Sequence, residues 1–164
     1  LSIRHNNVLS IGHVVDIVRH PDVPDRDLYV FDTENEKLVK VVSNLGTLLY
    51  GLAVDSKGRV FIAQADARNE VNGKSGTEKH GLKQLENRAF LNQVTRVEFG
   101  DHDTVSQRLE LEPLLPEQPT VQSALATPFA IQISEDDGTI VATAASSDKV
   151  FTMDAKSGEV LGRV

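Results

Sequence analysis

The sequence predicts an all-β fold built from repeated four-stranded antiparallel sheets, and three observations support this prediction. Segments 28–42 and 150–164 align without a gap as a strand ending on an Asp, a polar turn and a second strand. Segments 50–64 and 129–143 align as a strand, a turn closed by Gly and a second strand. The two kinds of hairpin alternate along the chain, so that successive hairpins complete a four-stranded meander.

The first kind of hairpin has its turn signal at the end of the leading strand. Asp32 and Asp154 occupy that place, and an Asp carboxylate there can accept a backbone N–H two residues further on. A looser third copy covers 94–111, with its turn at 99–103. The repetition of one turn chemistry at one place in the hairpin indicates a repeat architecture, because a β-sandwich of unrelated hairpins does not require it.

The second kind of hairpin places a Gly at the end of its turn. Gly58 and Gly138 are expected to take positive φ there, since glycine has no Cβ to clash. The later copy has one additional turn residue. The apolar run over 60–63 suits a strand that is buried on both faces.

Sheets repeated in this way are typical of β-propeller blades, and a propeller closes with about 4–8 blades around a channel. Residues 1–164 hold roughly 2.5 to 3 four-stranded antiparallel meanders and are predicted to be a partial propeller. The predicted ranges are an incomplete first blade over 13–42 with a strand at 13–19, a second blade over 48–111, a third blade over 127–164, and insertions at 66–91 and 112–126. Helix is expected only over 82–91, where Leu82, Leu85 and either Phe90 or Ala89 fall near one face.

So few blades leave sheet faces and strand edges uncovered. We therefore expect the chain to be a fragment of a larger propeller of about 6–8 blades. The further blades would come from the same polypeptide or from other subunits, and the first source is the favoured one. The chain by itself is not expected to behave as a compact monomer.

Composition excludes several classes of function. The net charge is −7 and the Lys and Arg residues form no basic stripe, so a nucleic-acid or anionic-membrane partner is not expected. The chain has no Cys, which excludes disulfides, thiolate zinc sites and Cys-x-x-Cys-His haem attachment within it. No apolar run reaches the ~18 residues that a membrane span requires.

A family resemblance becomes specific in the third blade. Residues 127–137 read Thr-Pro-Phe-Ala-Ile-Gln-Ile-Ser-Glu-Asp-Asp, and 147–154 read Ser-Asp-Lys-Val-Phe-Thr-Met-Asp. This resembles the repeat of YVTN-type bacterial propellers, with Ala130 in place of the usual Gly and Met153 in place of the usual Ile. Residues 50–61 also look like an NHL-type repeat. The resemblance implies an exported protein of the periplasm or cell surface, in a family whose members often serve as binding scaffolds.

The insertion at 66–91 is the most function-like segment. A loop of that length inside a compact repeat is usually functional or disordered, and propeller loops rim the ends of the channel. A solvated excursion that binds nothing is the alternative. The candidate binding residues are Asp66, Arg68, Asn69, His80, Glu86, Asn87 and Arg88.

No catalytic, cofactor-binding or metal-binding set is predicted. The five histidines lack ligand spacing, and no Gly-x-Ser-x-Gly elbow is present. The acidic clusters at 34–36, 101–103 and 135–137 coincide with turns and do not match a calcium loop.

The leading hypothesis is a non-catalytic scaffold that binds a protein or a small molecule at a propeller face. Two alternatives follow from propeller resemblances. One is a lactonase-like, metal-dependent hydrolase in which Asp66, Asn69 and Asn87 offer oxygen ligands. The other is a structural propeller of a c-type cytochrome or di-haem peroxidase-associated protein, whose haem or divalent metal is held on sequence outside this chain.

Overall fold

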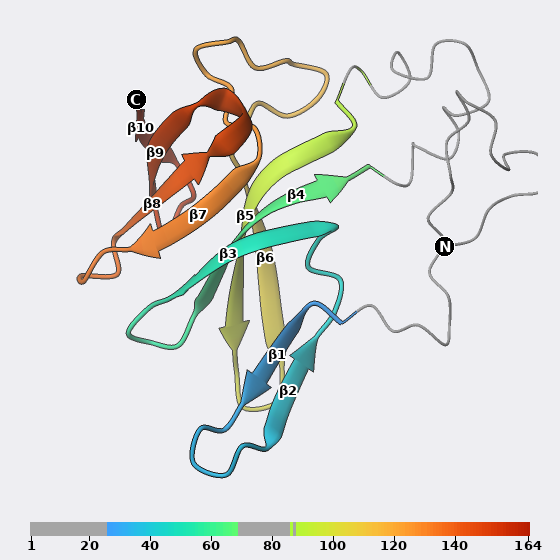
Figure 1. The fold of residues 1–164 in the computed structure, drawn as a ribbon, viewed down its shortest axis with the longest axis vertical. Coiled ribbons are helices and arrows are strands. Elements are labelled where there is room, and N and C mark those ends of the chain that lie inside the picture. The colour runs from blue at the N-terminus through green and yellow to red at the C-terminus, as the bar shows by residue number, and fades with distance from the viewer. Residues whose placement is uncertain (1–25, 69–85, 87) are drawn as a thin grey trace, which may run out of the picture. The chain divides into compact units, whose positions relative to one another are not determined.

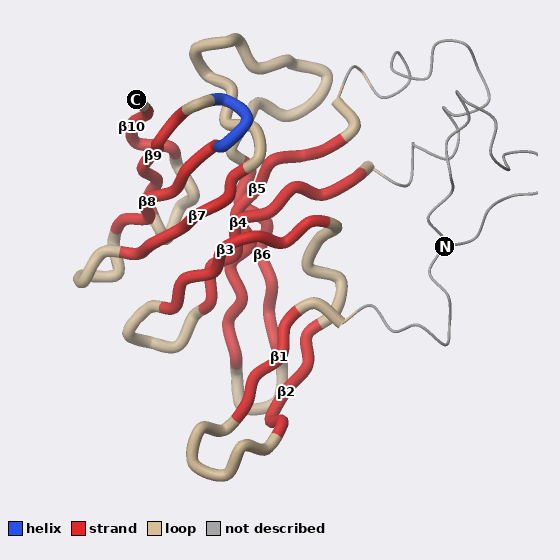
Figure 2. Tube along the Cα trace, viewed as in Figure 1, coloured by secondary structure: helices blue, strands red, loops and turns tan. Residues whose placement is uncertain are grey.

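The computed structural model describes residues 26–68, 86 and 88–164, and they form strands, turns and one 3-10 turn (Figures 1 and 2). The all-β prediction is confirmed. The strands are β1 (Leu28–Phe31), β2 (Leu38–Val42), β3 (Leu48–Val54), β4 (Val60–Ala67), β5 (Phe90–Phe99), β6 (Thr104–Glu110), β7 (Pro128–Ile133), β8 (Thr139–Ala144), β9 (Lys149–Asp154) and β10 (Val160–Arg163), with the 3-10 turn η1 at Ala145–Ser147.

The strands form three sheets in which every neighbour along the chain is also a neighbour in space. The orders are β1-β2, β3-β4-β5-β6 and β7-β8-β9-β10. The pairs β1–β2, β3–β4, β5–β6, β7–β8, β8–β9 and β9–β10 are antiparallel, as a meander requires. The chain divides into two compact units: β1-β2 belongs to one, and both four-stranded sheets belong to the other.

The core of the larger unit lies between its two sheets. Phe61 and Val94 on the β3–β6 side are at most 1% exposed, as are Phe151 and Met153 on the β7–β10 side. Alternate residues of each strand face this layer. In β4 both faces are buried, which confirms the prediction from the apolar run 60–63. The sheets meet at the core through aliphatic and aromatic side chains.

The first strands of the two sheets, β3 and β7, lie close together (Figure 1). A Cβ added at Gly51 would stand 2.5 Å from the backbone oxygen of Phe129, so only glycine allows this approach. The rings of Tyr50 and Phe129, which occupy equivalent places in the repeat, contact each other with centroids 5.1 Å apart.

Most of the turn predictions hold. Asp32 Oδ1 accepts the N–H of Glu34 at 2.8 Å, and Asp154 Oδ1 accepts the N–H of Lys156 at 3.0 Å, which confirms both carboxylates as turn initiators. Gly58 has φ +79°, as expected. At the later turn the prediction was wrong about the residue: Asp137, with φ +58°, takes the left-handed conformation. The extra turn residue moves that position one place earlier, and the short polar side chain of Asp tolerates it.

The helix predicted over 82–91 is wrong at its C-terminal end. Phe90 and Leu91 begin β5, where their apolar side chains serve a strand. Residues 82–85 and 87 lie outside the described part of the chain, as does the strand predicted at 13–19. No helix in the described residues is long and apolar enough to cross a membrane.

Candidate functional site

The two ends of the predicted insertion meet directly where β4 ends and β5 begins. The backbone N–H of Arg68 donates to the carbonyl of Ala89 at 3.0 Å, which continues the strand pairing by one further bond. Arg68 Nη1 also donates to the carbonyl of Arg88 at 3.3 Å and lies 3.1 Å from Glu86 Oε2. Its side chain is 11% exposed, so the guanidinium acts as a clamp at the base of the insertion and is not displayed to solvent.

Asp66 precedes this base and has partners of its own. Its Oδ1 accepts the hydroxyl of Thr47 at 3.0 Å, and its Oδ2 lies 3.3 Å from Arg108 Nη2. Both carboxylate oxygens of Asp66 are therefore engaged by neighbouring protein groups. Arg108 is half exposed, so this ion pair contributes at most about 1 kcal/mol to stability.

A row of polar side chains crosses three strands of β3–β6 at the same end of that sheet. Gln64 Nε2 donates to Gln93 Oε1 at 3.0 Å, and Gln93 Nε2 donates to Glu110 Oε1 at 2.6 Å. Gln64 and Gln93 are at most 1% exposed. Gly46 makes room for the row, because a Cβ there would lie 2.6 Å from Gln64 Oε1.

This row was not predicted. Its sequence signal is a single polar residue, Gln64, at the end of the apolar run 60–63. The equivalent residue of the later sheet is Ala144, since Ile62 and Ala142 pair with equivalent partners in the two sheets. The polar residue at this position of the repeat departs from the apolar pattern, and in the structure its side chain makes a buried hydrogen bond to Gln93.

The connection from β6 to β7 is held down by a second buried pair. Asn92 Nδ2 donates to Glu112 Oε2 at 3.0 Å, while Asn92 Oδ1 accepts the N–H of Thr127 at 2.9 Å. Glu112 Oε1 accepts the N–H of Leu125 at 3.0 Å. Asn92 and Glu112 are less than 10% exposed, so these bonds form in a partly dehydrated setting, where hydrogen bonds are stronger.

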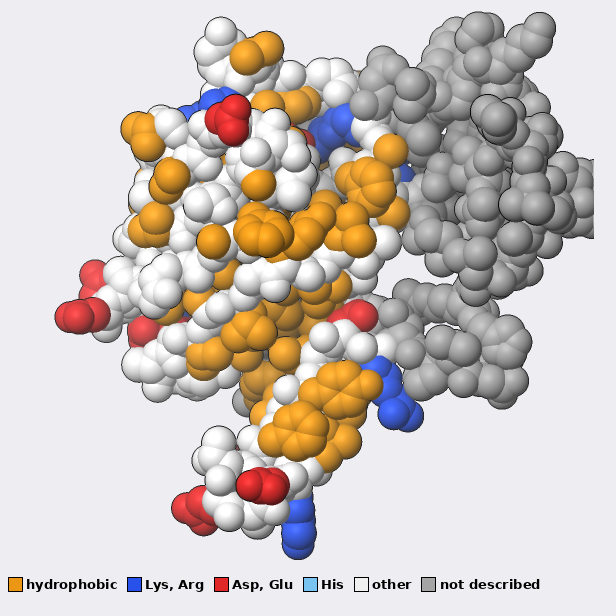
Figure 3. Space-filling model, viewed as in Figure 1, with side chains coloured by type: hydrophobic (Ala, Val, Ile, Leu, Met, Phe, Trp, Pro, Cys, Tyr) orange, Lys and Arg blue, Asp and Glu red, His pale blue; other side chains and the backbone are white. Residues whose placement is uncertain are grey.

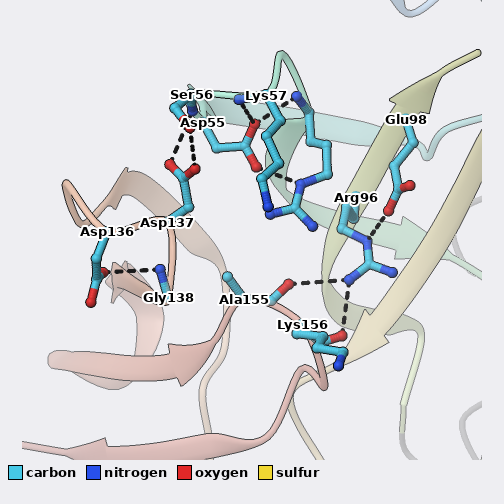
Figure 4. A network of polar contacts seen from close by, with 11 residues as sticks. Asp55, Ser56, Lys57, Arg96, Glu98, Asp136, Asp137, Gly138, Ala155 and Lys156 are labelled. Atoms are coloured by element: carbon cyan, nitrogen blue, oxygen red, sulfur yellow. Dashed lines mark hydrogen bonds and ion pairs between the residues drawn. The ribbon is translucent and has the colours of Figure 1, made fainter.

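The opposite end of the two sheets carries a second polar network, shown in Figure 4. The backbone N–H of Ser56, in the β3–β4 turn, donates to Asp137 Oδ1 at 3.0 Å, and the Ser56 hydroxyl binds the other oxygen. From β5, Arg96 Nη1 donates to the carbonyls of Ala155 and Lys156 at 3.2 and 2.9 Å. The β3–β4 turn and strand β5 are thus tied to turns of the other sheet.

Two further contacts complete that network. Arg96 Nε lies 2.9 Å from Glu98 Oε1, an ion pair without hydrogen-bond geometry at Nε. The Asp55 carboxylate binds the guanidinium of Arg59 and the backbone N–H groups of Lys57 and Arg59. Burial by itself would raise the pKa of Asp55, but these hydrogen bonds outweigh it and hold the pKa below its ordinary value of 3.8.

The predicted binding residues therefore separate into two groups. Arg68 contacts the side chain of Glu86 and the backbone of Arg88, Asp66 is bound to Thr47 and Arg108, and Arg88 is buried. Asn69, His80 and Asn87 lie outside the described residues. Within the described ranges, no three His, Asp or Glu side chains are grouped so that they could hold a metal ion.

What the described side chains offer chemically is hydrogen bonding and charge pairing. The residues at the base of the insertion fix its two ends, and the buried amides and carboxylates stiffen the sheet from which it departs. Rigid elements that carry a long connection are the usual arrangement in binding proteins.

Comparison with known proteins gives a likeness of fold. No protein-family model matches the chain, and no curated protein matches it. Among solved structures it is similar to hydrazine synthase from Kuenenia stuttgartiensis, with a TM-score of 0.57 and 15% sequence identity over 76% of this chain. The chain spans 32% of the length of that structure's chain. Since that structure contains a β-propeller, the likeness agrees with blade-like sheets, and the chain is an all-β protein of propeller-like four-stranded meanders.

Proposed function

We propose that this chain is a non-catalytic binding module of a larger β-propeller, and that the insertion at 66–91 presents its binding surface. The observation that carries the proposal is the clamped base of the insertion. Arg68 joins the two ends of the segment through the carbonyls of Arg88 and Ala89 and through Glu86. A long connection fixed in this way can display a surface without disturbing the sheet that carries it.

The chemistry of the described side chains supports binding over catalysis. The carboxylates of Asp66, Glu110 and Glu112, at this end of the sheet, already accept hydrogen bonds or pair with Arg108. A general base needs an accessible position beside its substrate, whereas these carboxylates are bound to neighbouring protein groups. The occupant of the surface would be a protein or a small molecule, in keeping with a net charge of −7.

The resemblance to YVTN-type repeats bears on the cellular location of the protein. It supports an exported bacterial protein of the periplasm or cell surface and a complete propeller of about 6–8 blades. Fractionation of the source cells tests the setting directly, because recovery of the protein with the cytoplasmic fraction would contradict it.

The binding proposal is tested by removing the surface while keeping its base. In the variant, residues 69–85 are replaced by a short Gly-Ser turn and the Arg68–Glu86 clamp is retained. Both forms are immobilised and exposed to the extracytoplasmic fraction of the source organism, and retained molecules are quantified by mass spectrometry. We expect one molecule retained by the wild type to be lost from the variant, and its binding to be reproduced with the purified molecule.

The control for this experiment is thermal unfolding. The variant is expected to unfold within a few degrees of the wild type, because the entropic cost of closing a connection changes only slowly with its length. Equal retention of the same molecules by both forms, with equal stability, would show that the insertion is not the binding surface.

A further inference from the structure

The two four-stranded sheets can be compared residue by residue, because their cross-strand pairs correspond. In β5–β6, Val94 pairs with Leu109, and in β9–β10, Val150 exchanges both backbone bonds with Val164. On the second strand of each sheet, Phe61 pairs with Ala53 and Val141 pairs with Gln132. The counterparts across the repeat are therefore Phe61 and Val141, Val94 and Val150, and Leu109 and Val164.

The first member of each pair covers the core, and the second does not. Phe61, Val94 and Leu109 are 0–4% exposed because they pack onto β7–β10. Val141 and Val150 are 42% and 41% exposed. We call the side of β7–β10 formed by Val141, Val150, Thr152, Gly162 and Val164 the outer face. It is the counterpart of the face with which β3–β6 covers its neighbour.

The outer face is hollowed along β9 and the edge strand β10. A shallow depression of about 180 Å³ is lined by Val150, Phe151, Thr152, Gly162, Arg163 and Val164. At the same place in β3–β6 stand Arg96 and Gln107, which are much larger than Thr152 and Gly162. The smaller pair leaves room for a bulky side chain from a partner.

The β1–β2 hairpin carries the opposite kind of face. Its register matches that of β9–β10, with Tyr29 in the place of Phe151, Phe31 in the place of Met153 and Leu38 in the place of Val160. Phe151 and Met153 are fully buried beneath β3–β6.

On the hairpin these positions are open. Tyr29, Phe31 and Leu38 are 45%, 56% and 49% exposed, and the two rings stack with centroids 6.4 Å apart. Figure 3 shows hydrophobic side chains gathered over this hairpin. We call this surface the aromatic face.

We propose that the outer face of one copy of this chain packs onto the aromatic face of a second copy, head to tail. The contact would repeat the packing that the chain already shows between its two four-stranded sheets. There the face of β3–β6 that carries Phe61 and Val94 covers the face of β7–β10 that carries Phe151 and Met153. Each copy has one face of each kind, so the contact is between different surfaces and can be repeated. Repetition closes a ring or extends a chain of copies, and both arrangements bury the exposed apolar residues.

The first measurement is the molar mass of the 164-residue chain by light scattering and sedimentation over a wide range of concentrations. We expect the mass to rise above 17.9 kDa with increasing concentration. Val150→Lys on the outer face and Phe31→Lys on the aromatic face should each reduce the mass to that of a monomer, because a buried unpaired ammonium is strongly unfavourable. Val105→Lys, at a 61% exposed strand position on neither face, is the matched control and should associate as the wild type does.

The decisive experiment mixes the two variants. The Val150→Lys chain keeps an intact aromatic face, and the Phe31→Lys chain keeps an intact outer face. An equimolar mixture should therefore form a complex of about twice the monomer mass that grows no further. Formation of that complex also shows that both variants are folded.

Three results would overturn the proposal. A wild-type chain that stays monomeric at every concentration has no such contact. Association that Val150→Lys abolishes and Phe31→Lys leaves intact would indicate pairing of two outer faces. A mixture of the variants that remains monomeric, while the wild type associates, would exclude the head-to-tail arrangement.

Discussion

At the scale of single residues, short-range hydrogen bonds account for the turns. Asp32, Asp55 and Asp154 each accept a backbone N–H from the residue two positions on. The contact needs only a few neighbouring residues, which is why the sequence alone predicts it for Asp32 and Asp154. Asp55 differs from the other two because its side chain is fully buried and also binds the guanidinium of Arg59.

This difference gives a pH dependence that can be measured. The folded-state pKa of Asp55 is below 3.8, so its charged form stabilises the fold above the unfolded-state pKa. That contribution is lost as the pH falls through the folded-state pKa. We expect Asp55→Asn to lower the free energy of unfolding by about 2 kcal/mol at pH 7, since a charged hydrogen-bonded group is lost. The difference between the two proteins should shrink below about pH 4.

Urea denaturation of both proteins between pH 3 and pH 7 measures this difference. Asp32→Asn, at an exposed turn, is the control and should change stability by no more than about 0.5 kcal/mol. A constant difference between wild type and Asp55→Asn across the pH range would show that the Asp55 charge is not what stabilises the turn.

At the scale of elements, the approach of β3 to β7 depends on one residue without a side chain. Gly51 lies against the backbone oxygen of Phe129, and a backbone atom cannot move aside as a flexible side chain can. Ala130 occupies the position of the repeat that is equivalent to Gly51. The alignment therefore does not indicate that this position in β3 needs a residue without a side chain. Only the contact between two sheets reveals it.

We expect Gly51→Ala to lower the free energy of unfolding by about 3 kcal/mol, because the two strands must separate. Gly58→Ala is the matched control. Gly58 has positive φ with no heavy atom within 4 Å of an added Cβ, so its substitution should cost about 1 kcal/mol for backbone conformation alone. Chemical denaturation of the two variants tests the ranking, and equal losses would argue against a steric role for Gly51.

At the scale of the whole molecule, the alternating hairpins build two four-stranded sheets that share one hydrophobic core. One face of β3–β6 covers β7–β10. Ser56 and Asp137 join a turn of each sheet, and Arg96 of β5 binds the β9–β10 turn. A repeat of this kind places its long connections at the sheet ends, where a binding surface can vary without altering the core.

The binding proposal also predicts the metal content of the purified protein. We expect elemental analysis to find no divalent metal near one equivalent per chain, and chelation by EDTA to leave the unfolding temperature unchanged. One equivalent of a divalent metal, with a loss of stability on chelation, would favour the lactonase-like alternative over a non-catalytic module.

The sequence by itself determined the elements and their order. The alternation of apolar residues, the Asp and Gly of the turns and the repetition of both are local properties, and they predicted an all-β chain of four-stranded meanders. They also singled out 66–91 as an interruption, although the apolar residues at its end suggested a helix where Phe90 and Leu91 begin a strand.

The tertiary structure decided how these local elements are used. The buried row of Gln64, Gln93 and Glu110 joins residues 17 and 29 positions apart in the chain. The ion pair of Arg68 with Glu86 joins the two ends of the insertion. Whether an apolar face covers a neighbour, as at Phe61, or stays open, as at Val141, is equally absent from the local pattern. Burial depends on which surfaces meet, and that depends on packing between elements distant in the sequence.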